Sequence, residues 1–297
     1  MKKRLISIII NCYNGEKYLS QTLNSILSQK YKRYEVIFID NCSTDSSAKI
    51  FKNINDKRFK YFKTLKKVKL YDGRNIALRK CKGKFITFID VDDWWDKNFL
   101  SSREKFFNSS KNYGFCYSNC YHYLQNTGKY KNFYKKILPS GFILNDLLRL
   151  YCVKVGTIII KKHLFKKYKF NSNFNIIGDY DLIIRMSKKY KAMSFNDKLV
   201  YIRVHENNFS HNNRKMFYIE FKRWLLNQNF KDKFFKCNKS HLYNKLEYLR
   251  LTHLLFNHKK LSLIFDIIRF PSILQKMKLL IVYFVPSFLL NFVRNIF

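Results

Sequence analysis

Residues 85–96 read FITFIDVDDWWD, a short apolar run that ends in a cluster of carboxylates. Four acidic residues follow the run within seven positions: Asp90, Asp92, Asp93 and Asp96. A continuous apolar run of this length is typical of a strand that is buried on both faces of a sheet. We therefore expect a buried strand whose carboxyl end carries the chemistry of the protein.

The residues before this stretch alternate between strand and helix patterns. Residues 5–10 (LISIII) and 35–40 (EVIFID) are apolar, β-branched runs typical of parallel strands, and a weaker strand is expected around residues 59–62. A helical face lies between the first two runs: Leu19, Leu23, Ile26 and Leu27. Residues 73–83 (GRNIALRKCKG) predict a helix that stops at its final glycine. This order predicts a doubly wound parallel sheet flanked by helices.

The composition makes the acidic cluster unusual. The chain has 297 residues with 58 Lys plus Arg against 20 Asp plus Glu, a formal net charge of +38. A hydrophobic content of 47% allows a substantial core, so a disordered protein is excluded. The positive charge indicates an anionic partner, which is a nucleic acid, a nucleotide or an anionic membrane face.

The cysteines and the N-terminus further restrict the class of protein. Seven cysteines without a CxxC pair argue against a disulfide framework and a zinc knuckle, and they fit a reducing cytoplasm. Cys116, Cys120 and His122 offer three metal ligands, but no fourth lies nearby, and an aromatic strand is the favoured interpretation. Residues 1–12 resemble a signal peptide only superficially, because the apolar run is short and no small-residue cleavage site follows, so we predict a first strand.

The predicted strand ends bring polar groups to one edge of the sheet. In open α/β sheets ligands bind beyond the carboxyl ends of the strands, which here are residues 11–14, 40–41 and 90–93. The chain has no GxGxxG or GxxxxGK[ST] motif to hold phosphate. Asp90 and Asp92 can instead give two hard oxygen ligands to Mg²⁺ or Mn²⁺ and leave positions for diphosphate oxygens and water. The competing interpretation is a solvated acidic turn that caps a helix near Asp96.

Five motifs in this order resemble the inverting family-two glycosyltransferases of the GT-A fold. They are SIIINCYNGEKYLSQTLNSILSQ, EVIFIDNCSTDSS, GRNIALRKCKGKFITFIDVDDWW, IIGDYDLIIRM and YIRVHENNFS. The resemblance covers about residues 4–210 and implies a Rossmann-like mixed or parallel sheet over a catalytic domain of residues 1–212. Within it, residues 1–97 would bind the nucleotide sugar and residues 98–212 the acceptor. We expect residues 213–297 to form a helical, basic extension.

The resemblance also implies roles for individual residues. Those matching nucleotide-binding positions are Tyr13, Asn14, Asp40, Arg74, Asn75 and Asp90. Those matching the positions around Mn²⁺ or Mg²⁺ are Asp92, Asp90 and His205. Asp179 matches the general base. The chemistry independently requires such parts, because displacement of a nucleoside diphosphate needs Lewis-acid stabilisation of the leaving group and a base at the acceptor hydroxyl. Without a covalent intermediate, the anomeric configuration inverts.

The chain departs from the family pattern at several positions. Asn11 stands where a small residue or proline is common, residues 41–42 where Asp-Gly is common, and Gly178 where a glutamate precedes the base. Because Gly178 replaces this glutamate, an inactive relative of the family is an alternative interpretation of the chain. Asp181 is an alternative base, although a pair with Arg185 four residues later is its expected role.

Two tryptophans and the C-terminal tail also allow more than one interpretation. Trp94 and Trp95 either stack on a sugar or pack in the core. Residues 279–290 (LLIVYFVPSFLL) form the most apolar stretch, which is shorter than the ~20 residues that span a bilayer. Its basic flanks are Arg269, Lys276, Lys278 and Arg294. We expect it to lie on an anionic membrane, and the alternative is a final pair of helices packed on the catalytic domain.

The sequence therefore predicts a metal-dependent inverting glycosyltransferase at the inner face of the cytoplasmic membrane. Its donor would be a nucleoside-diphosphate sugar, UDP-linked by family frequency, and its acceptor a glycan or lipid-linked hydroxyl in surface-polysaccharide or lipopolysaccharide synthesis. The alternative from another class is a basic nucleic-acid-binding protein. Against it stand the carboxylate edge and the lack of a nucleic-acid-binding motif.

Overall fold

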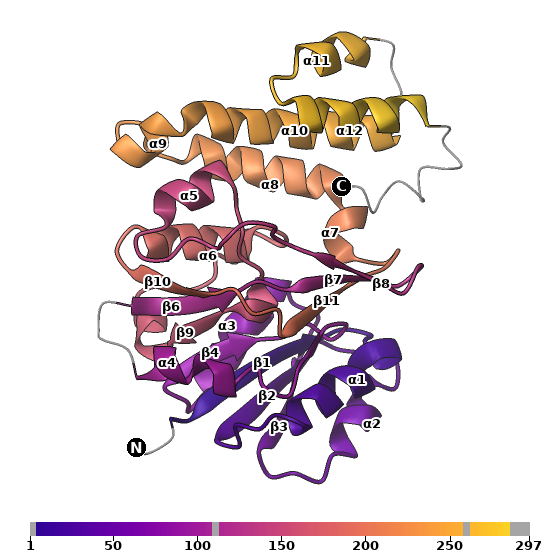
Figure 1. Cartoon of the computed structure of the whole chain (residues 1–297). Helices are drawn as coiled ribbons and strands as arrows, with labels where there is room; N and C mark the ends of the chain where they lie inside the picture. The colour runs from indigo at the N-terminus through magenta and orange to yellow at the C-terminus, as the bar shows by residue number, and fades with distance from the viewer. Residues whose placement is uncertain (1–3, 109–112, 258–261, 286–297) are drawn as a thin grey trace. The chain divides into compact units, whose positions relative to one another are not determined.

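The computed structural model describes residues 4–108, 113–257 and 262–285, which fall into two compact units (Figure 1). The first unit is Met1–Leu147 with Tyr151–Arg203, and the second is Leu148–Leu150 with Val204–Phe297. The chain thus divides between Arg203 and Val204, and a functional boundary at residue 212 stays a prediction.

A seven-stranded mixed sheet forms the centre of the first unit, in the order β10-β6-β9-β4-β1-β2-β3. Its strands are β1 (Ile6–Cys12), β2 (Tyr34–Asp40), β3 (Phe59–Lys63), β4 (Phe85–Phe88), β6 (Tyr113–Ser118), β9 (Ile159–Lys161) and β10 (Lys191–Phe195). The pairs among β1, β2, β3 and β4 are parallel, as the apolar runs predict. The short strand β9 is antiparallel to both neighbours, β4 and β6, and this makes the sheet mixed.

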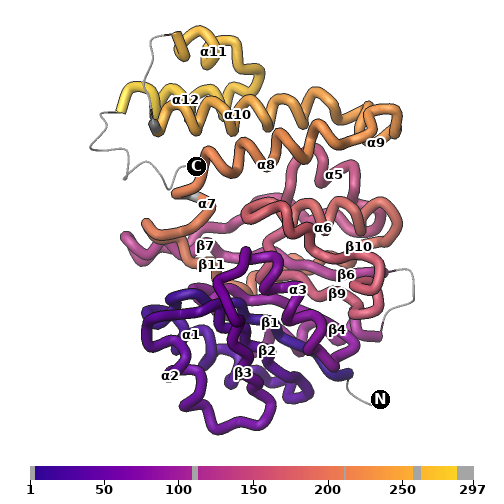
Figure 2. The backbone as a smooth tube through the Cα atoms, turned by 180° about the vertical axis from the view of Figure 1, so that it is seen from behind, coloured from indigo at the N-terminus to yellow at the C-terminus, as the bar shows by residue number. Residues whose placement is uncertain are grey.

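Helices cover both faces of the parallel half, as expected for a doubly wound fold. Helices α1 (Glu16–Leu27) and α2 (Ser47–Lys52) pack on the face that carries Ile8 and Phe38. Helix α3 (Leu70–Lys80) lies across the sheet from them, which the two opposite views make visible (Figure 2). This alternation follows from right-handed crossovers whose direction reverses at β1. Every residue of β2 is buried, since both of its faces are covered.

The chain also forms a smaller sheet and short helices, which belong to the first unit except for the last two residues of α5 and the last residue of β11. A four-stranded sheet has the order β5-β11-β7-β8. Its strands are β5 (Trp94–Trp95), β11 (Val200–Val204), β7 (Tyr121–Leu124) and β8 (Lys129–Asn132). The helical segments are η1 (Ser101–Arg103), α4 (Glu104–Phe107), α5 (Leu144–Arg149), η2 (Val155–Thr157), η3 (Lys162–Lys166) and α6 (Gly178–Ser187). Because β5 directly follows the acidic stretch, this sheet anchors the end of that loop.

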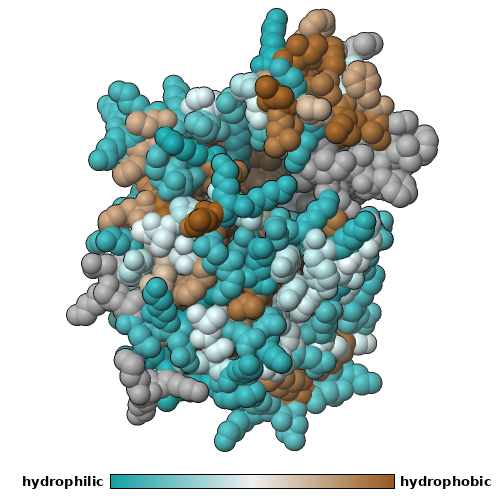
Figure 3. Space-filling view, in the orientation of Figure 1, coloured by the Kyte–Doolittle hydropathy of each residue, from teal (hydrophilic) through white to brown (hydrophobic). Residues whose placement is uncertain are grey.

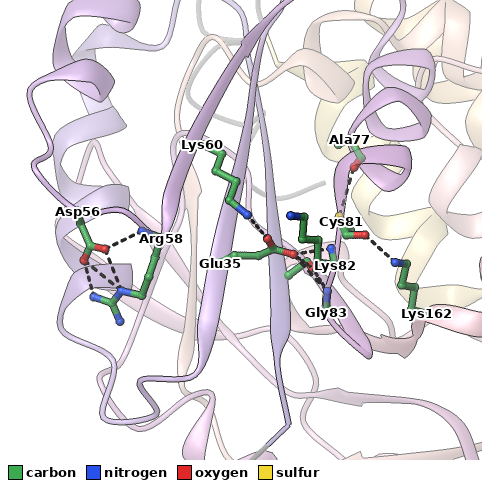
Figure 4. A network of polar contacts seen from close by, with 10 residues as sticks. Glu35, Asp56, Arg58, Lys60, Ala77, Cys81, Lys82, Gly83 and Lys162 are labelled. Atoms are coloured by element: carbon green, nitrogen blue, oxygen red, sulfur yellow. Dashed lines mark hydrogen bonds and ion pairs between the residues drawn. The ribbon is translucent and has the colours of Figure 1, made fainter.

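A buried carboxylate joins the strands at their amino ends, opposite the predicted site (Figure 4). Glu35, at the start of β2, accepts hydrogen bonds from Ser7 Oγ and Lys60 Nζ, each at 2.6 Å, and from the backbone nitrogens of Lys82 at 2.5 Å and Gly83 at 3.1 Å. Although burial opposes it, this hydrogen bonding, led by Lys60, lowers the pKa of Glu35. The donors come from β1, β3 and the turn before β4, so one side chain ties four strands together.

The described part of the second unit is helical, as the sequence predicts. Its helices are α7 (Phe209–Asn212), α8 (Arg214–Leu226), α9 (Lys233–Cys237), α10 (Lys239–Asn257), α11 (Leu263–Arg269) and α12 (Ile273–Phe284). Leu251 and Leu255 of α10 form a core with Leu263, Ile267 and Leu279 of the last two helices. None of the helices in residues 4–108, 113–257 and 262–285 is long and apolar enough to cross a membrane.

Candidate active site

The carboxyl ends of β1 and β2 lie side by side and carry predicted nucleotide-binding residues. The strand register places Cys12 opposite Asp40. Asp40 is fully buried, and its carboxylate accepts hydrogen bonds from the Tyr61 hydroxyl and from Ser43 N at 2.8 Å. The Asn14 amide holds the loop after β2, because its Oδ1 accepts from Thr44 N at 2.9 Å.

Tyr13 presents an exposed ring next to these residues. Lys67 Nζ lies 3.5 Å from the centroid of this ring. An exposed ring beside a cation can stack on a base, as the resemblance implies for Tyr13. Cys42, which stands where glycine is common in the family, has φ 60, a left-handed conformation that glycine adopts without strain. Cys42 therefore has the backbone conformation that glycine would adopt at this position, at the cost of backbone strain.

The acidic stretch after β4 forms a cluster of carboxyl groups. Arg74 of α3 lies 2.7 Å from Asp90 Oδ1, and the side chain of Arg74 is 3% exposed while that of Asp90 is 40% exposed. Desolvation raises the pKa of Asp90, the Asp92 charge adds to this rise, and Arg74 opposes it. Burial, followed by the charges of Asp92 and Asp90, raises the pKa of Asp93 well above its usual range. The charges of Asp90 and Asp92 thus disfavour the ionisation of neighbouring carboxyl groups, and a divalent cation would fit such a cluster.

Asp93 and Arg203 anchor the loop that carries Asp92. Asp93 is 4% exposed, and its Oδ1 accepts from the backbone nitrogen of Arg203 at 2.9 Å. The Arg203 side chain donates from Nε to the Asp92 carbonyl at 2.9 Å, and its guanidinium lies 4.5 Å from the Tyr18 ring and 4.7 Å from the Trp94 ring. Asp93 was predicted only as a member of the acidic cluster, without a role of its own, and no role was predicted for Arg203. The signal was present, since both residues lie inside motifs that carry the family resemblance.

The two tryptophans have different surroundings. Trp95 is buried, and its Nε1 donates to the Gly156 carbonyl at 3.0 Å, so the packing interpretation holds for this residue. Trp94 is only partly buried and lies parallel to Tyr201 of β11, with ring centroids 5.2 Å apart. Sugar stacking by Trp94 stays a prediction.

Asp179 lies at the start of α6, near Arg74 and Asp90. Its Oδ1 accepts from Tyr180 N at 2.8 Å and lies 3.3 Å from the Tyr71 hydroxyl. Its charge contributes to the raised pKa of Asp90, so the two carboxylates interact. Asp181 instead forms an ion pair of 2.8 Å with Arg185, which confirms the expected pair four residues apart. Asp179 is therefore the acidic residue of α6 that is not committed to an arginine.

Asn75 and His205 have structural partners of their own. The Asn75 amide donates to the Phe170 carbonyl at 2.9 Å and accepts from Phe170 N at 3.1 Å, so it fixes the segment before α6. His205 belongs to the second unit, and its Nδ1 accepts from Asn207 N at 3.2 Å. The nucleotide role of Asn75 and the metal role of His205 stay predictions.

The described residues contain no group of three His, Cys, Asp or Glu side chains that could hold a metal ion. Asp90 and Asp92 carry hard carboxylate oxygens, the donors that Mg²⁺ and Mn²⁺ prefer. Cys116 and Cys120 are fully buried, and burial raises the pKa of each thiol to about 12. The metal site imagined from Cys116, Cys120 and His122 does not form in this part of the structure.

Comparison with known proteins defines the class. The chain matches Glycosyl transferase family 2 over residues 7–168. It is 32% identical over 218 residues to the Escherichia coli UDP-Glc:alpha-D-GlcNAc-diphosphoundecaprenol beta-1,3-glucosyltransferase WfaP, covering 71% of this chain and 82% of that protein. S. aureus TarS (residues 1–349, in complex with UDP-GlcNAc) shares the fold with a TM-score of 0.64 at 18% identity, over 98% of this chain and 90% of that chain.

A second solved structure supports the same fold. The mannosyltransferase PcManGT from Pyrobaculum calidifontis, in complex with GDP-Man and Mn²⁺, has a TM-score of 0.62 at 14% identity, over 98% of this chain and 84% of that chain. The fold and the sequence match together define a glycosyltransferase of the GT-A type. Within that class, the chain belongs to glycosyl transferase family 2. The family match confirms the predicted enzyme class and fold. It does not support the alternative of a nucleic-acid-binding protein.

Proposed function

We propose that the protein is a metal-dependent, inverting transferase that moves a sugar from a nucleoside-diphosphate sugar, by default a UDP-sugar, to a hydroxyl of a lipid-linked or glycan acceptor. The observation that carries the proposal is the convergence of Asp90, Arg74 and Asp179 beyond the carboxyl ends of the parallel strands. Ligands of open α/β sheets bind at this edge. Tyr13, Asn14 and Asp40 at the neighbouring strand ends are suited to the nucleotide.

The residues divide the reaction between a leaving-group side and a nucleophile side. Asp92, with Asp90, would hold Mn²⁺ or Mg²⁺, which supplies Lewis-acid stabilisation of the leaving diphosphate when bound. Arg74 adds positive charge beside Asp90. Asp179 takes the proton of the acceptor hydroxyl. At the same time the oxygen of that hydroxyl bonds to the anomeric carbon, and the bond from this carbon to the diphosphate oxygen breaks. Attack from the face opposite the leaving group inverts the anomeric configuration.

The acceptor class rests on a relative and on the surface of the second unit. WfaP acts, by its name, on a sugar linked to diphosphoundecaprenol. We propose an acceptor of the same kind for this chain, used in the synthesis of a surface polysaccharide or lipopolysaccharide. An enzyme with such an acceptor works at the inner face of the cytoplasmic membrane and benefits from a surface that binds lipid.

Helices α11 and α12 provide that surface. Their inner faces pack on α10, while their outer faces expose apolar side chains: Phe265, Ile268, Ile273, Leu274, Met277, Ile281 and Phe284. Figure 3 shows hydrophobic residues gathered over these two helices. The basic residues Arg269, Lys276 and Lys278 lie on the same helices, and each adds about 1 kcal/mol of attraction near an anionic membrane. Residues 286–290 of the apolar run, and Arg294, lie outside the described residues.

Calorimetric titration with UDP and with GDP, in Mn²⁺ and then in EDTA, tests the active site. We expect Asp92→Asn to abolish metal-dependent nucleotide binding, and Asp179→Asn to keep binding but lose turnover. Asp56→Asn is the matched control, because this carboxylate pairs with Arg58 in the turn before β3. Undiminished, metal-dependent binding by Asp92→Asn would sink the metal assignment, and turnover retained by Asp179→Asn would sink the base.

Vesicle flotation tests the membrane surface. The double substitution Leu274→Gln and Met277→Gln should reduce association with phosphatidylglycerol vesicles without unfolding the protein, since both side chains are exposed. Leu226→Gln is the control, because this leucine is exposed on α8, away from α11 and α12 in sequence. If both variants float like the wild type, the apolar face of α11 and α12 does not hold the protein on lipid.

A further inference from the structure

Gly178, the residue that replaces the family's glutamate, lies directly against an aromatic ring. A Cβ atom at Gly178 would lie 2.5 Å from both Cδ2 and Cε2 of Tyr71 and 2.7 Å from its Cζ. Such distances are far inside van der Waals contact, so any larger residue would force the ring to move. Tyr71 is 1% exposed and stacks on Phe170 with centroids 5.3 Å apart, so its ring is confined.

The hydroxyl of the same tyrosine reaches the start of α6. It donates to the Ile176 carbonyl at 2.8 Å and lies 3.3 Å from Asp179 Oδ1. Burial, followed by the charge of Asp179, raises the pKa of Tyr71 well above its usual value. The phenol therefore keeps its proton at any pH at which the enzyme works, and it remains a hydrogen-bond donor.

We propose that Tyr71 is a positioning residue for the catalytic base, and that Gly178 is glycine because the Tyr71 ring occupies the space beside it. The proposal rests on the assignment of Asp179 as the base. The single hydroxyl proton of Tyr71 is shared between the Ile176 carbonyl and Asp179 Oδ1, and Tyr180 N donates to the same Oδ1. These contacts orient the carboxylate, and within the proposal Oδ2 takes the proton of the acceptor hydroxyl.

Gly178 is then compatible with an active enzyme. The loss of the usual glutamate suggests an inactive relative when the sequence is considered alone. In the structure, the hydroxyl of a tyrosine from α3 lies between the Ile176 carbonyl and the carboxylate of the proposed base at the same helix start. The Arg74 guanidinium lies 5.5 Å from the Tyr71 ring, so one side chain contacts both the arginine of the leaving-group side and the base.

Tyr71→Phe tests the hydroxyl, because phenylalanine keeps the ring beside Gly178. Loss of a hydrogen bond to a charged group lowers the rate by about 10- to 100-fold. We expect this loss in kcat, with the donor KM and Mn²⁺-dependent UDP binding unchanged. The acidic limb of the kcat profile should move to higher pH, because the lost donor favoured the ionised carboxylate. The other charged or titratable groups that act on this site are Arg74, Asp90 and Tyr151, and all three are retained.

Asp179→Asn, measured alongside, separates the two hypotheses. If it keeps turnover, the assignment of the base fails, and the role of Tyr71 fails with it. If it loses turnover while Tyr71→Phe has a normal kcat and an unmoved acidic limb, the base stands and the positioning role is refuted. A tyrosine that only fills space predicts this second outcome.

A double-mutant cycle tests the steric half of the proposal. Overpacking by Gly178→Ala should lower the Tm by about 2 to 10 °C. In a Tyr71→Ala background the same substitution should cost almost nothing, since the clashing ring is gone. An equal cost in both backgrounds would show that the Tyr71 ring is not the reason for glycine at residue 178.

Discussion

Replacing Arg203 by methionine should loosen the loop that carries Asp92 and weaken metal-dependent nucleotide binding. Arg203 is 7% exposed, and its guanidinium bonds the Asp92 carbonyl and the Gln21 side chain. The substitution leaves both acceptors without this donor, at about 1 kcal/mol each for partly buried groups. It also removes cation–π contacts worth about 0.5–1 kcal/mol each. We expect a loss of about 3–4 kcal/mol in the free energy of unfolding.

The same variant should bind UDP with Mn²⁺ less tightly. If about 1–2 kcal/mol of that free energy holds Asp92 in place, the Kd rises roughly 5- to 30-fold. Urea denaturation gives the first quantity, and calorimetric titration gives the second. Arg58→Met is the matched control, since Arg58 forms a partly exposed pair with Asp56 that contributes about 1 kcal/mol or less.

Two results would contradict this reasoning. Destabilisation with an unchanged Kd would mean that Arg203 stabilises the fold without positioning Asp92. A variant as stable as the wild type would mean that the buried contacts of Arg203 contribute no net free energy.

Three further predictions concern stability, each measured by urea denaturation. Glu35→Gln should cost about 1–3 kcal/mol near neutral pH, and because the pKa of Glu35 is lowered in the folded state, the gap from wild type should narrow as pH falls below about 4; a gap that does not narrow at all as the pH falls would refute the linkage. Arg103→Met should cost about 3 kcal/mol, because the fully buried guanidinium forms a bidentate pair with Asp197, yet UDP binding should be unaffected. Cys42→Gly should add about 0.5–1 kcal/mol by relieving its positive φ, and a loss of stability would show that the Sγ contact with Thr64 outweighs the backbone strain.

The local part of the fold was predictable from sequence because each signal lies within a few residues. The runs at residues 5–10 and 35–40 have the composition of doubly buried strands, and the predicted parallel order follows from the helices between them. The antiparallel strand β9 was not predicted. It has three residues, too few for a periodic pattern, and it pairs with strands far away in the chain.

The same distinction holds for the site. The roles of Asp90 and Asp92 could be predicted because an apolar strand directly precedes them in the sequence. The bond from Arg203 to the Asp92 carbonyl spans 111 positions, and the contact between Tyr71 and Asp179 spans 108. No local pattern encodes such contacts, so the residues that orient the predicted groups became visible only in the fold. Gly178 was noticed as a departure from the family, but its cause lies on another helix.

The contact between Gly178 and the Tyr71 ring also restricts how this enzyme can change over evolutionary time. A side chain at residue 178 and a ring at residue 71 exclude each other, because the first atom of the one would lie inside the other. A larger residue at 178 should therefore be tolerated best when residue 71 is smaller than tyrosine. The residues at positions 71 and 178 should therefore vary together. A glycine before the base is informative about activity only when the residue at position 71 is known.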